Sequence, residues 1–153
     1  MLKRAKEHIN AIIMAFYLMC VWTAYIYLNV LMKIDENQII HGNVNVLVQV
    51  VNNMISNAIQ AYDGKHDQNI QLEISKDSGN VIFSVTDFAG GLPKEVQNRL
   101  FKEMVTTKGK NGTGLGLYMS YSNIKAHFGG DITYKTEDGK GTTFNVIIPI
   151  NRQ

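Results

Sequence analysis

Three glycines alternate with small and apolar residues at positions 112–117, in the order Gly-Thr-Gly-Leu-Gly-Leu, and lead into an apolar-periodic segment. Glycine has no Cβ, so the backbone can turn its N–H groups toward an anion that approaches closely. A helix that begins at such a turn adds unpaired N–H groups and the positive end of its dipole. The run therefore favours a phosphate-binding turn, with a purely structural loop before a helix as the alternative.

Two common phosphate-binding motifs do not fit this run. A Walker loop needs Gly-Lys followed by Ser or Thr, whereas Gly109-Lys110 is followed by Asn111. The dinucleotide-binding fingerprint has the spacing Gly-x-Gly-x-x-Gly directly after a strand, whereas this run follows polar residues and is spaced Gly-x-Gly-x-Gly. A phosphate site here must belong to another fold.

Amide side chains recur along residues 44–62, which have the periodicity of a long helix. Gln49, Asn53 and Asn57 stand four positions apart, and because Asn is a mediocre helix former their presence needs a reason. A hydrated helix face is one reason. The other is that amide oxygens face a cation that already carries phosphate ligands, which is how Mg²⁺ is usually held.

Asp87 ends a predicted strand and is followed closely by Ala89-Gly90-Gly91. A carboxylate at this place can accept a hydrogen bond from an exocyclic amine, while the two glycines leave room for a flat ring. An aspartate turn that simply closes the strand is the alternative.

Helices and strands must position these residues, and the periodicity of the hydrophobic residues predicts where those helices and strands lie. Helices are expected over residues 5–22, 44–62, 93–101 and 115–128, and strands over residues 24–34, 70–75, 81–87, 132–135 and 142–150. Residues 102–111 are expected to form a mobile loop. Asn43 or Asn45 is expected to cap the second helix. The apolar stripe of that helix comprises Leu47, Val50, Val51, Met54, Ile55, Ala58 and Ile59.

The composition suits one globular domain with one core, at 153 residues with 45% hydrophobic and 18% charged residues. A net charge of +2 gives no argument for nucleic acid, and a single cysteine excludes a disulfide framework. Residues 9–32 carry no charge and could span a bilayer. Apolar and polar residues alternate over residues 25–33, however, so we expect a strand there and no membrane span.

Four segments now match a family in order. Residues 53–58 resemble its asparagine box, residues 87–91 its first glycine box, residues 100–108 its phenylalanine box and residues 112–117 its second glycine box. The chain thus resembles, over roughly residues 24–150, the catalytic and ATP-binding domain of sensor histidine kinases in the GHKL superfamily. Two departures are Ala89, where many members carry glycine, and Met104, where an aromatic residue is usual.

The resemblance implies an α+β two-layer sandwich, the Bergerat fold, in which a mixed β-sheet packs against three helices and a flexible lid covers ATP. Residues 24–153 would form this domain. Residues 1–23 would be a helix remaining from the linker to a dimerisation hairpin.

The resemblance also implies residue roles. Asp87 would bind the adenine amine and Gly91 would let adenine approach. Asn57 would ligate Mg²⁺, with Asn53 second, and both would act in catalysis together with Lys108, which would reach the γ-phosphate. Thr142 or Thr143 would reach adenine through water, with Thr143 the residue assigned to the site. The phosphates would lie against Gly112, Thr113, Gly114, Leu115 and Gly116.

The implied function is phosphoryl transfer from ATP-Mg²⁺ to a histidine on a separate dimerisation domain, with a response regulator downstream. His8 does not match the family's acceptor, because Ile9 and Asn10 follow it. We therefore expect a cytoplasmic catalytic part of a longer or split kinase, dimeric only in the full-length protein. The alternatives are a nucleotide-binding regulatory module without transfer and a serine kinase of an anti-sigma type.

Overall fold

The computed structural model describes residues 26–33, 40, 42–63, 68–101 and 115–150. The predicted helix over residues 5–22, the N-terminal unit of residues 1–23 and the predicted loop over residues 102–111 lie outside these ranges. The described elements follow in the order β1 (Ile26–Lys33), α2 (Val44–Ala61), β2 (Gln68–Asp77), β3 (Asn80–Asp87), α3 (Lys94–Gln97), α4 (Leu115–Phe128), β4 (Asp131–Glu137) and β5 (Gly141–Pro149).

The five strands form one sheet in the order β1-β2-β3-β5-β4. β1 pairs with β2 in parallel, and the other three pairings are antiparallel, so the expected mixed sheet is confirmed. Ser78 and Gly79, with φ of 49° and 78°, join β2 to β3. Positive φ at both central residues is the geometry of a tight hairpin turn, and it fixes the register of these two strands.

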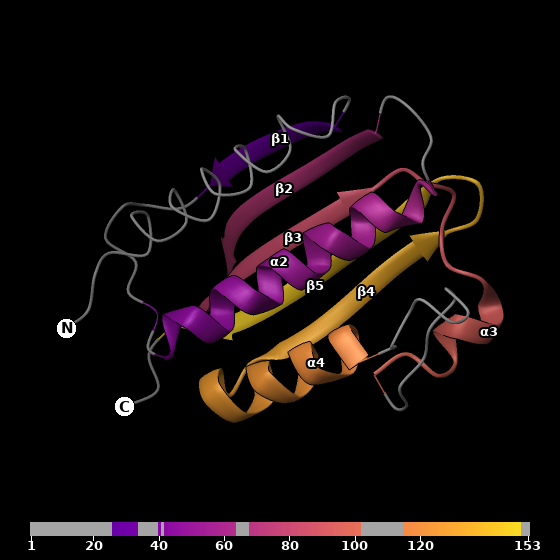
Figure 1. Ribbon diagram of the computed structural model, residues 1–153. Helices are drawn as coiled ribbons and strands as arrows, with labels where there is room; N and C mark the ends of the chain where they lie inside the picture. Colours follow the sequence, from indigo (N-terminus) through magenta and orange to yellow (C-terminus); the bar gives the residue numbers. More distant parts are fainter. Residues whose placement is uncertain (1–25, 34–39, 41, 64–67, 102–114, 151–153) are drawn as a thin grey trace.

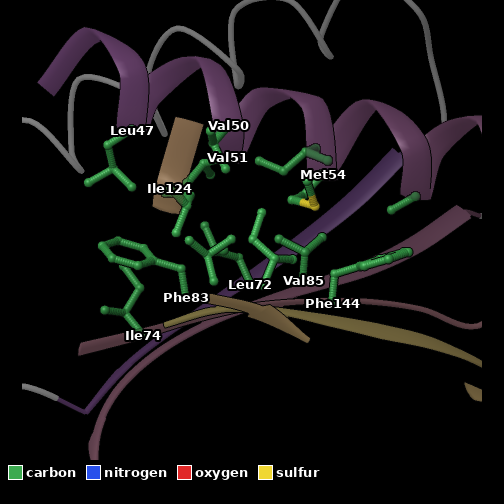
Figure 2. Packing of buried hydrophobic residues seen from close by; sticks show 14 of the residues in the cluster. Leu47, Val50, Val51, Met54, Leu72, Ile74, Phe83, Val85, Ile124 and Phe144 are labelled. Atoms are coloured by element: carbon green, nitrogen blue, oxygen red, sulfur yellow. The ribbon is translucent and has the colours of Figure 1, made fainter. Parts of the chain in front are cut away.

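One face of the sheet is covered by α2 and α4, which lie side by side and run in opposite directions (Figure 1). Alternate residues of β2, β3 and β5 point into the layer between sheet and helices, where Leu72, Phe83 and Phe144 are buried (Figure 2). The apolar stripe of α2 is buried as predicted except for Ile59, which is half-buried. Asn43 caps this helix by accepting a hydrogen bond from the Asn45 amide at 3.0 Å.

The third helix differs from the prediction. α3 has only four residues, and the chain has left the helix before Phe101, whose φ is +63°. This conformation places the Phe101 ring against Tyr121, Tyr134 and Phe144, with ring centroids 5.2, 6.1 and 6.5 Å away. Packing of one aromatic side chain therefore overrides the helical periodicity of residues 98–101. The other long helix, α4, has the predicted bounds.

The uncharged run of residues 9–32 ends in β1, as the alternation of its side chains predicted. Among the residues that the structure describes, no helix is long and apolar enough to cross a membrane.

Candidate functional site

The predicted site residues that are described lie at one end of the molecule. The C-terminal half of α2, the last residue of β3, the first residues of β5 and the first turn of α4 all meet there (Figure 1). This convergence follows from the topology, because α2 and β3 run toward this end while β5 and α4 begin at it. Lys108, Gly112, Thr113 and Gly114 lie outside the described residues.

Asp87 is the acidic group at this end. It is 4% exposed, and its Oδ1 accepts a hydrogen bond from the Ala89 amide at 3.0 Å. Burial raises the pKa of Asp87 above its ordinary value, and hydrogen bonds from the backbone of Ala89 and Thr142 oppose that rise. A carboxylate held in such a place gains from a hydrogen-bond donor supplied by a ligand.

Thr142, rather than Thr143, shares the face of Asp87. Asp87 on β3 and Thr142 on β5 are directly paired, and Thr142 is 3% exposed. Thr143 lies on the opposite face of the sheet, where its hydroxyl is 2.9 Å from that of Thr86. Successive side chains of a strand point to opposite faces, so only one of the two can reach the helix side. We therefore replace Thr143 by Thr142 among the candidate residues.

The segment after Asp87 is held against the turn between β4 and β5. The Gly139 amide donates to the Gly90 carbonyl at 2.9 Å, and the Leu92 amide donates to the Thr136 hydroxyl at 2.8 Å. Gly91 has φ of +91°, and a Cβ there would lie 2.6 Å from the Glu137 carbonyl oxygen. The need for glycine at this position is thus already explained by contacts within the protein.

Asn53 and Asn57 are half-buried, and Asn53 lies on the side of α2 that faces α4. The Asn53 Nδ2 donates to the hydroxyl of Ser120 on α4 at 3.1 Å. The two helices are antiparallel (Figure 1), so helix geometry places Asn57, one turn after Asn53, near the turn of α4 that contains Gly116, one turn before Ser120. The amide groups and the start of α4 are therefore neighbours.

The first turn of α4 offers the backbone N–H groups that the glycine run predicted. The helix begins at Leu115, and a Cβ on Gly116 would meet nothing within 4 Å. Nothing in the described protein thus requires glycine at this position. The first N–H groups of a helix have no partner within the helix, and together with the open space at Gly116 they suit a phosphate.

The residues at this end also fit Mg²⁺ in the way the amide pattern predicted. Among the described residues, no group of three or more His, Cys, Asp or Glu side chains could hold a metal ion. With Nδ2 engaged by Ser120, Asn53 keeps its oxygen as an available ligand atom, and Asn57 supplies a second amide oxygen. One or two neutral oxygens suit a cation whose remaining ligands are phosphates and waters.

Comparison with known proteins agrees with this geometry. A family profile described as "Histidine kinase-, DNA gyrase B-, and HSP90-like ATPase" matches residues 42–152. The chain belongs to this family. Its description makes ATP the nucleotide of this ATPase domain. The signal transduction histidine-protein kinase AtoS of Escherichia coli (strain K12) is 38% identical over 119 residues, which are 78% of this chain and 19% of AtoS.

Other relatives of the ATPase domain are similar in kind. Sporulation kinase E of Bacillus subtilis (strain 168) is 37% identical over 121 residues, or 78% of this chain and 16% of the kinase. The chain thus spans about a fifth of the length of these curated relatives. The solved catalytic domain of the histidine kinase ThkA has a TM-score of 0.81 and 23% identity, with 98% of this chain and 95% of that chain covered, and it supports the fold.

Sequence reasoning missed two residues that hold the elements of the candidate site together. Ser120 follows the glycine run closely, but its partner is 67 positions away, so only the packing of α4 on α2 reveals it. Tyr62 was also missed: its hydroxyl accepts from the Phe88 amide at 3.0 Å and donates to the Asn69 carbonyl, which ties the end of α2 to the strands beside Asp87.

Proposed function

We propose that this ATPase domain binds ATP with Mg²⁺ and transfers the γ-phosphoryl group to a histidine on a separate dimerisation domain, as the catalytic part of a two-component sensor kinase. The observation that supports this most is the placing of Asn57, Asp87 and the start of α4 at one end of the fold. The names of AtoS and sporulation kinase E support the choice of a kinase.

Each group has a part in this proposal. Asp87 accepts a hydrogen bond from the adenine amine, and Thr142 reaches the ring through water. The N–H groups of Leu115 and Gly116 bind phosphate oxygens, together with Gly112, Thr113 and Gly114. Lys108 meets the γ-phosphate. Phosphoryl transfer depends on positioning and charge stabilisation, so groups of this kind suffice on the donor side.

Asn57 and Asn53 hold the ion in this proposal, through neutral oxygens that leave its other positions to phosphates and water. When bound, Mg²⁺ neutralises charge on the phosphates. The further partner is a response regulator; one solved relative of the fold, ThkA, has been described in complex with the response regulator protein TrrA. We place the domain in the cytoplasm, where ATP and the regulator are found.

The decisive experiment mixes the chain with ATP, Mg²⁺ and a kinase hairpin that carries an acceptor histidine. We expect phosphate that is labile in acid and stable in base on the hairpin, and no stable label on the chain incubated alone. ATP binding without transfer to any hairpin would favour the regulatory module instead. Acid-stable phosphate on an added protein would favour a serine kinase.

A further inference from the structure

Ser120 is an unusual residue in the interface between α2 and α4. Its exposure is 1%, and among the described residues it is one of only three buried polar or charged side chains, with Asp87 and Thr142. Its hydroxyl accepts a hydrogen bond from Asn53 at 3.1 Å. A buried hydroxyl is costly unless it is bonded, so this contact offsets the cost of burying Ser120 between the two helices.

In the structure the contact engages the donor end of the Asn53 amide, with the Ser120 hydroxyl as acceptor. An asparagine side chain has a donor end, Nδ2, and an acceptor end, Oδ1. Because Nδ2 is engaged by Ser120, the oxygen is the end left to face a ligand. A reversed amide would present N–H groups instead, and these repel a cation.

We propose that Ser120 is a positioning residue that holds the Asn53 amide with its oxygen toward the metal side of the bound nucleotide. This inference rests on the proposed function. It adds a part of α4 that does not touch the nucleotide but sets the orientation of a group that does.

The placing of Ser120 on α4 gives the contact a second consequence. Ser120 lies one turn after Gly116, in the same helix whose first N–H groups are proposed to bind the phosphates. A shift of α4 along its axis would therefore move the N–H groups and loosen the Asn53 amide together. In the described part of the chain, this side-chain hydrogen bond joins the amide-bearing helix α2 to α4.

The test measures ATP affinity by calorimetry, once with Mg²⁺ and once with EDTA, for the whole 153-residue chain. We expect Ser120→Ala to weaken binding about tenfold with Mg²⁺, as is typical when a group that orients a metal ligand is lost, and to leave binding in EDTA unchanged. Ser84→Ala is the matched control. It removes a serine–asparagine contact of 2.8 Å, from Ser84 to Asn145, on the face of the sheet opposite α2 and α4.

Two further variants separate orientation from packing. Ser120→Cys keeps the shape of the side chain, with a slightly larger atom that is a weak acceptor, so we expect the same loss restricted to Mg²⁺. This variant decides the matter if Ser120→Ala does not fold. Asn53→Ala combined with Ser120→Ala should be no weaker in Mg²⁺ than Asn53→Ala alone, because Ser120 acts through Asn53.

An equal loss in Mg²⁺ and EDTA would show a packing role and overturn the inference, as would wild-type affinity in the Ser120 variants or an equal affinity of the wild type in both buffers. Failure of the proposed function has different results: either the wild-type chain binds no ATP in either buffer, or it binds ATP but transfers no phosphate to the acceptor hairpin.

Discussion

Replacing Asp87 by Asn should separate nucleotide affinity from stability. The carboxylate accepts the Ala89 amide on Oδ1 at 3.0 Å and a further hydrogen bond from the backbone of Thr142, and since it has about four acceptor sites, others remain for the adenine amine. In Asp87→Asn the amide oxygen can keep the Ala89 contact, and the NH₂ group then faces the amine, donor against donor. A hydrogen bond to a charged group contributes about 1.5–3 kcal/mol. We therefore expect ATP affinity to fall about 10- to 150-fold.

The stability of the nucleotide-free protein should change in the opposite sense. Because burial raises the pKa of Asp87, the folded protein keeps this proton at pH values where the unfolded chain has lost it. Stability therefore falls as the pH rises from the unfolded pKa through the folded one, and it stays lower above both. Asn carries no charge, so Asp87→Asn should be at least as stable as the wild type at pH 7 and should lack this fall.

Calorimetry with ATP-Mg²⁺ measures the loss of ATP affinity. Urea unfolding without nucleotide, at several pH values between about 3.5 and 7, measures the change in stability. Asp131→Asn is the matched control, because Asp131 is half exposed and paired with Lys125 at 3.1 Å, away from the site. Its affinity for ATP should equal that of the wild type. Unchanged affinity in Asp87→Asn would remove Asp87 from the nucleotide site and refute the reasoning.

The remaining predictions concern Asn57 and two glycines. Asn57→Ala should lower the rate of phosphoryl transfer about 100- to 1000-fold, because losing an electrostatic partner typically raises the barrier by about 2.7–4 kcal/mol. The same variant should weaken ATP binding in EDTA only a little. Equal losses in both assays would indicate a structural role. Gly116→Ala should leave the urea midpoint unchanged or higher, because a Cβ there meets nothing within 4 Å, but should weaken ATP binding by calorimetry. Gly141→Ala should lower the free energy of unfolding by about 1–3 kcal/mol, because its Cβ would lie 2.0 Å from the Asp87 carbonyl oxygen; a midpoint equal to that of the wild type would contradict this.

Much of the fold could be predicted because the residues of the core recur with the periods of helices and strands. The stripe of α2 and the alternation of β1, β2 and β3 needed only the spacing of apolar residues. α3 could not be predicted to its end, because Phe101 leaves the helix to join aromatic rings from α4, β4 and β5. Contacts of that kind depend on tertiary packing and leave no mark in the local pattern.

The choice between Thr142 and Thr143 was within reach of the sequence. Phe144, Val146 and Ile148 are the apolar, buried residues of β5, and Thr142 has the same parity. Period-two alternation therefore places Thr142 on the core face and Thr143 on the other. Ser120 differs, since its importance arises from a contact between two helices whose pairing no local rule gives.

Gly141, Gly116 and Asp87 differ in what they contribute to the stability of the fold. Gly141 is required by the protein itself, because the backbone of β5 passes too close to Asp87 for a side chain. Gly116 is not required by any described contact, so an approaching ligand is the simplest reason for it. Burial disfavours the charged form of Asp87, hydrogen bonds from the backbone of Ala89 and Thr142 offset this only in part, and a ligand donor would offset it further. A residue that lowers the stability of the folded protein, or that the fold does not need, is expected to serve binding. By this reasoning Asp87 and Gly116 are the residues that most clearly indicate the nucleotide site.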